Sequence, residues 1–85
     1  MEIVVTECLR KALKLPDWVE IIEPAGLHSW HGWLFGSGHP SQFGKGIVWK
    51  ALEHLEHCPK CRKASDLTKA EVKRELERFN RFFAP

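Results

Sequence analysis

The segment His54–Ala64, HLEHCPKCRKA, concentrates residues that can do chemistry. It holds two histidines and two of the chain's three cysteines. Cys58 and Cys61 form a Cys-x-x-Cys turn, which brings two thiolates close enough to bind one ion. His54 precedes Cys58 by four residues, about one helical turn, so its imidazole projects in the same direction. Soft ligands at this spacing predict a zinc site.

Two other interpretations compete for the cysteine pair. Cys-x-x-Cys with Pro59 after the first cysteine resembles the glutaredoxin active site, which would make the chain a thiol redox protein. In that family, however, the pair follows an N-terminal strand and opens the first helix, whereas here it follows a polar helical segment. Alternatively, both cysteines are small core residues, although a lysine-rich turn is an unusual place for them. Metal binding remains the favoured interpretation.

The same segment resembles the His-x-x-x-Cys-x-x-Cys core of the zinc-binding anti-sigma factor family, which typically reads HLxxCPxCR. The match covers about residues 54–64. The resemblance implies a small helical domain in which one zinc ion holds helices together and which binds a protein partner. In that family the remaining ligand comes from the first helix, which makes Cys8 the candidate here.

The residues themselves leave the fourth ligand open. Cys8 offers a thiolate from a helical segment, although a cysteine on an apolar helix face is often a packing residue. The alternatives are a ligand from a second copy of the chain and the histidines His28, His31, His39 and His57. We predict one structural zinc per chain, bound by His54, Cys58, Cys61 and Cys8, because four protein ligands leave no position for a catalytic water. Whether oxidation of the thiolates releases the metal stays open.

Helical patterns flank this segment. Apolar residues at helical spacing predict one amphipathic helix over residues 3–14 and another over residues 46–57. Pro59 disfavours helical geometry in Cys58 and suits the first turn of a new helix. Thr68 and Glu71 match a capping box that starts a last helix. Its apolar stripe consists of Val72, Leu76, Phe79 and Phe83.

The middle of the chain is less regular. The segment PDWVEIIEPAG fits a short helix that starts with Pro16 in its first turn, but its β-branched residues fit an extended strand as well. The following segment, Gly26–Gly46, is rich in glycine, tryptophan and histidine, which predicts a loop or short hairpin with aromatic anchors. The expected fold class is therefore mainly α: a single domain over residues 1–85 with three to four helices, stapled by zinc.

Composition limits the function classes. The chain has 85 residues, of which 44% are hydrophobic and 28% charged, as expected of a globular domain. Its net charge of +2 is too small to indicate nucleic-acid binding by itself. The N-terminal residues lack a signal-peptide pattern and no apolar run could span a bilayer, so we expect a cytoplasmic protein with no membrane partner.

A zinc-binding regulatory protein that acts through protein contacts, anti-sigma-like or transcription-regulator-like, is the expected function. Trp30, Trp33, Phe35 and Trp49 are of the kind enriched at interface hot spots, although they could equally fill a small core. The partner would be another protein or a second copy. The alternative is a zinc-stabilised DNA- or RNA-binding module, because residues 62–81 are rich in lysine and arginine. We expect no enzyme activity and no small-molecule substrate, because no nucleophile stands in a recognised arrangement with the histidines.

Overall fold

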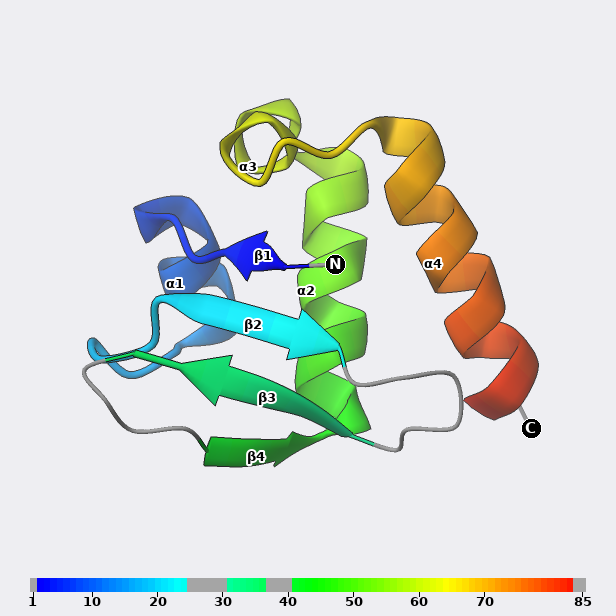
Figure 1. The fold of residues 1–85 in the computed structure, drawn as a ribbon. Helices are drawn as coiled ribbons and strands as arrows, with labels where there is room; N and C mark the ends of the chain where they lie inside the picture. Colours follow the sequence, from blue (N-terminus) through cyan, green and yellow to red (C-terminus); the bar gives the residue numbers. More distant parts are fainter. Residues whose placement is uncertain (1, 25–30, 37–40, 84–85) are drawn as a thin grey trace.

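A computed structural model describes residues 2–24, 31–36 and 41–83 of the chain. These residues form four strands and four helices (Figure 1). Their bounds are β1 Ile3–Val4, α1 Glu7–Leu13, β2 Ile21–Pro24, β3 His31–Phe35, β4 Ser41–Gly44, α2 Lys45–His57, α3 Pro59–Ala64 and α4 Lys69–Phe83. None of the helices in the described part of the chain combines the length and apolar character needed to cross a membrane.

The strands form one antiparallel sheet in the order β1-β2-β3-β4. Its register places Ile3 opposite Ile22 and Ile22 opposite Leu34. All three side chains are fully buried, so they form a continuous apolar row across three strands on one face of the sheet. Two further backbone hydrogen bonds extend the pairing: the Val5 N–H donates to the Glu20 carbonyl at 2.9 Å, and the Glu20 N–H donates to the Phe35 carbonyl at 2.8 Å.

Helix α2 is the centre of the packing. It contacts strands β2, β3 and β4 as well as all three other helices, and in Figure 1 it lies behind the sheet with α1 to one side and α4 to the other. Its buried residues, Val48, Ala51, Leu52 and Leu55, recur at helical spacing. The core also includes buried residues from other elements and from the connection between α1 and β2, namely Ile3, Leu9, Leu15, Val19, Ile22, Leu34, Cys61, Val72 and Leu76.

The prediction of a mainly helical fold with three to four helices is confirmed, since the described residues form four. The predicted end of the second helix near Cys58 and the new helical turn from Pro59 are also confirmed, since α2 ends at His57 and α3 begins at Pro59. The Thr68–Glu71 capping box is present in both directions. The Thr68 N–H donates to Glu71 Oε1, and the Glu71 N–H donates to Thr68 Oγ1, each at 3.1 Å.

The prediction of a helix over residues 3–14 is wrong at its start. Ile3 and Val4 form a strand, and α1 begins only at Glu7. The physical reason is that Thr6 is an N-cap, with extended backbone and a side chain that accepts the Leu9 N–H. The segment Gly26–Gly46 also forms more than the expected loop or short hairpin. It contributes strands β3 and β4 to a four-stranded sheet. Within the ambiguous segment PDWVEIIEPAG, residues 21–24 form strand β2 and residues 17–18 form a turn, while its last two residues lie outside the described part of the chain.

Candidate metal centre

The three helices α1, α2 and α3 bring Cys8, His54, Cys58 and Cys61 together. One ligand atom from each residue lies within 4.8 Å of each of the others. The His54 Nε2 atom is 3.4 Å from both the Cys8 sulfur and the Cys61 sulfur. All three cysteines are free thiols rather than disulfide partners. These four residues, the same four that the sequence nominates, could therefore hold a metal ion.

The two separations from the His54 Nε2 atom to the Cys8 and Cys61 sulfurs are close to those in a tetrahedral zinc site. Zinc–sulfur bonds of about 2.3 Å and zinc–nitrogen bonds of about 2.0–2.1 Å imply sulfur–nitrogen separations of about 3.6 Å in a tetrahedron. The observed separations of 3.4 Å differ from this by only a few tenths of an ångström. Three sulfurs and one imidazole nitrogen are also the donor set that favours zinc over harder ions such as magnesium or calcium.

The turn between α2 and α3 places three of the four candidate ligands, His54, Cys58 and Cys61. Pro59 occupies the first turn of α3, and Cys58 is its N-cap residue with extended backbone. Arg62, in α3, also fixes the turn. Its Nη1 atom donates to the Leu55 carbonyl at 2.9 Å and to the Glu56 carbonyl at 2.7 Å. These carbonyls lie at the end of α2, where intrahelical partners are missing. Arg62 therefore holds the end of α2 against α3, and His54 beside the cysteines.

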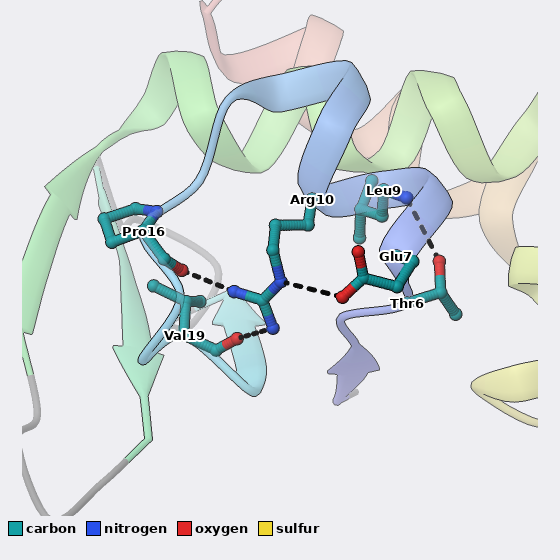
Figure 2. Close-up of polar contacts among 6 residues, drawn as sticks. All are labelled: Thr6, Glu7, Leu9, Arg10, Pro16 and Val19. Atoms are coloured by element: carbon teal, nitrogen blue, oxygen red, sulfur yellow. Dashed lines mark hydrogen bonds and ion pairs between the residues drawn. The ribbon is translucent and has the colours of Figure 1, made fainter.

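Separate polar contacts fix α1, which carries Cys8 (Figure 2). The Arg10 guanidinium donates to the carbonyls of Pro16 and Val19 and lies 3.7 Å from a Glu7 carboxylate oxygen. The Pro16 and Val19 carbonyls belong to the connection between α1 and β2, so Arg10 ties the helix to the start of the sheet. At its other end, α1 begins at the Thr6 cap. Cys8 thus projects from a helix that is anchored at both ends.

The two cysteines of the turn differ in their readiness to ionise. A backbone hydrogen bond from Cys61 lowers the pKa of the Cys58 thiol below its ordinary value. Burial raises the pKa of the Cys61 thiol to about 11, since the residue is 0% exposed and a charge there loses its hydration. Without a metal, the Cys61 thiol therefore keeps its proton at neutral pH. A divalent cation would displace it, as metal binding to thiols generally does.

Thr6 also lies at the cluster, and the sequence reasoning missed it. Its Oγ1 atom is 3.1 Å from the Cys61 sulfur, across a separation of 55 residues. A signal was available, because a threonine before a glutamate and an apolar stretch is a common helix N-cap. The predicted helix over residues 3–14 placed Thr6 inside a helix rather than at its N-cap position, so this signal was not used. No local pattern, however, could have placed this hydroxyl beside Cys61.

The other histidines considered as ligands lie elsewhere or are not described. His57 is exposed, and its Nε2 atom is 3.4 Å from a Glu56 carboxylate oxygen; it is not among the four clustered residues. His28 and His39 lie outside the described residues, as does the side chain of His31. Of the candidates for the fourth position whose side chains are described, Cys8 is the one that the fold brings to His54, Cys58 and Cys61.

Comparison with protein-family models, with curated proteins and with solved structures gave no match for this chain.

Proposed function

We propose that this chain is a small zinc-binding protein in which one structural zinc ion joins α1 to the turn between α2 and α3. The observation that carries the proposal is the convergence of four ligand atoms within 4.8 Å of one another from three helices. The donor set supports zinc in particular, because thiolates and imidazole are its usual ligands. Four protein ligands support a structural role, since they fill the tetrahedron and leave no site for a reacting water.

We further propose that the zinc-stapled domain works through protein contacts, as a regulator of the anti-sigma or transcription-regulator kind. The supporting surface is a groove of about 250 Å³ between α2 and α4. Trp49 is 37% exposed at this groove, and its indole N–H donates to Asn80 Oδ1 at 3.2 Å. A half-exposed tryptophan that is already oriented loses little freedom on binding, which suits an interface anchor.

Metal content tests the first part of the proposal. Protein purified without a metal-affinity tag would be analysed by elemental mass spectrometry as wild type, Cys58→Ser, Cys8→Ser and His57→Ala. The last is the matched control, because His57 lies next to Cys58 but outside the cluster. We expect about one zinc per chain in the wild type and in His57→Ala, and loss of zinc in both cysteine variants. A wild type that binds neither zinc nor cobalt would falsify the proposed site.

Partner capture tests the second part and separates it from the nucleic-acid alternative. Zinc-loaded wild type, Trp49→Ala and Lys50→Ala would serve as baits at low and high salt. Lys50 is the control, because it is exposed on the same helix but does not line the groove. A protein partner that is lost only with Trp49→Ala and that withstands salt supports the regulator. Recovery of DNA or RNA with a steep loss at higher salt supports the alternative instead.

A further inference from the structure

Thr6 makes two contacts with one hydroxyl group. Its Oγ1 atom accepts the Leu9 N–H at 3.1 Å as the cap of α1, and the same atom lies 3.1 Å from the Cys61 sulfur. A hydroxyl has one hydrogen to donate and two lone pairs that accept. The amide of Leu9 can only donate, so it takes up a lone pair. The hydroxyl hydrogen is then free for the sulfur.

The three sulfurs of the cluster differ in what can solvate them. Cys8 is exposed, so water reaches its sulfur. The Cys58 sulfur receives the backbone hydrogen bond from Cys61. Cys61 is 0% exposed, and the Thr6 hydroxyl and the His54 ring nitrogen both lie within hydrogen-bond distance of its sulfur. When His54 Nε2 is occupied by a metal it cannot donate, which leaves Thr6 for this role.

We propose that Thr6 is a positioning residue of the metal centre, whose hydroxyl donates a hydrogen bond to the metal-bound sulfur of Cys61. This inference rests on the proposed zinc binding and adds a residue outside the four ligands. Hydrogen bonds to the ligands of a metal orient those ligands and strengthen binding. Here the bond also joins the first turn of α1 to α3.

The position of Thr6 couples two ligands that come from different parts of the chain. Cys8 is two residues beyond Thr6, in the first turn of the helix that Thr6 caps. The contact that holds the Cys61 sulfur therefore also sets where α1 begins, and so where the Cys8 sulfur lies. Losing the hydroxyl should affect both ligands, whereas losing an ordinary helix cap should affect only the stability of the helix.

Three substitutions separate these roles. Thr6→Val keeps the shape of the side chain but removes the hydroxyl, and Thr6→Ser keeps the hydroxyl. Thr68→Val is the matched control, because Thr68 also caps a helix through its hydroxyl but is not part of the cluster. A fourth variant, Thr6→Asp, keeps an oxygen that can accept the Leu9 N–H but, once ionised, has no hydrogen to donate.

The experiment measures zinc affinity by competition with a chromophoric chelator, and the thiolate-to-metal charge-transfer band of the cobalt-loaded protein. We expect Thr6→Val and Thr6→Asp to weaken zinc binding by about 10- to 100-fold and to shift the cobalt band. Thr6→Ser should restore both, and Thr68→Val should change neither. Because Thr6→Asp retains the cap, it still tests the donated hydrogen bond if Thr6→Val folds poorly.

Two outcomes overturn the inference, and they differ from failure of the proposed function. If the wild type binds one metal ion but Thr6→Val and Thr6→Asp retain its affinity and its cobalt spectrum, Thr6 is only a helix cap. If Thr6→Ser fails to restore the spectrum, the hydroxyl is not the group that matters. If the wild type itself binds no metal, the zinc proposal fails first and Thr6 loses its role with it.

Discussion

The two sides of α2 are held by different kinds of interaction. On one side, α1 and α3 each bury a single residue, Leu9 and Cys61, and meet α2 at the cluster of thiols and imidazole. On the other side, α4 packs Val72 and Leu76 into the apolar core. The helices also differ in length: α1 and α3 have 7 and 6 residues, whereas α4 has 15.

This difference indicates what a metal ion bound at the cluster would do. Helices shorter than about 12 residues are marginal by themselves, because nucleation fixes several residues for each hydrogen bond gained. Helix α4 has its own supports in a capping box and an ion pair between Glu75 and Arg78 at 3.1 Å. Helices α1 and α3 bury too little to compensate in the same way. We therefore expect the metal to stabilise the α1–α3 side locally and the apolar core to stabilise the rest.

Removal of the metal gives the largest effect and tests this division directly. At a thousandfold excess of free zinc over its dissociation constant, zinc would stabilise the folded state by about 4 kcal/mol. Chelation should increase hydrogen exchange in residues 6–14 and 58–65 while the amides of α4 stay protected. Hydrogen-exchange mass spectrometry with zinc and with chelator measures this, with His57→Ala as the control. An equal loss of protection in α4 would show that the two sides are not independent.

Truncating Leu76 tests the opposite side of α2. This residue is 7% exposed on α4, so Leu76→Ala should lower the free energy of unfolding by about 2–5 kcal/mol through lost burial and the cavity left behind. It should leave the zinc content at the wild-type value. Lys73→Ala, at an exposed position of the same helix, should stay within about 0.5 kcal/mol. Denaturant unfolding and metal analysis of the three proteins give the result; loss of zinc in Leu76→Ala contradicts it.

Arg62 lies on the α1–α3 side, where it joins α3 to the end of α2, and its replacement should have an intermediate effect. Arg62→Met keeps most of the aliphatic stem but removes both hydrogen bonds to the carbonyls of Leu55 and Glu56. Hydrogen bonds from a charged donor contribute about 1.5–3 kcal/mol, so stability should fall by about that amount. Zinc affinity should fall as well, because the turn that sets His54 beside Cys58 loosens. Unchanged affinity would mean that the cysteine ligands alone hold the turn.

The sequence predicted the region from α2 to α4 well because its signals are local. Helical periodicity, the proline after Cys58 and the Thr68–Glu71 pair each act within a few residues. The candidate ligands His54, Cys58 and Cys61 could be predicted for the same reason, since they lie within one turn and its flanks. The fold then brings them together with Cys8, which the sequence offered only as one candidate among several.

The features that could not be predicted from the sequence depend on contacts between distant residues. Whether Ile3 and Val4 continue a helix or pair with a strand depends on Ile21 and Ile22, and the apolar pattern of residues 3–5 alone cannot distinguish these. Cys8 and His54 are 46 residues apart, and three strands of the sheet lie between them in the chain. The contact of Thr6 with Cys61 is of the same long-range kind. Such juxtapositions come from the register of the sheet and the packing of α2 rather than from spacing.

Removing the capping box of α4 should give the smallest effect. It tests whether the α4 side is independent of the metal cluster. Thr68→Ala should cost about 1 kcal/mol of stability without changing zinc binding. The Thr68 N–H lowers the pKa of the Glu71 carboxyl in the folded state. A lowered pKa contributes stability above the unfolded value of about 4.3 and loses it as the pH falls through the folded value. Glu71→Gln should remove this acid dependence.

To keep the thiolates out of this measurement, both proteins are studied without metal. Unfolding of the wild type and of Glu71→Gln is compared between neutral pH and about pH 3, a range that spans the titration of ordinary carboxylates. The difference in stability between them should be greatest near neutral pH and shrink toward the acid end, with the Glu71 carboxyl followed by NMR. A difference that does not change with pH would mean that Glu71 caps α4 without its charge, as a neutral glutamine could.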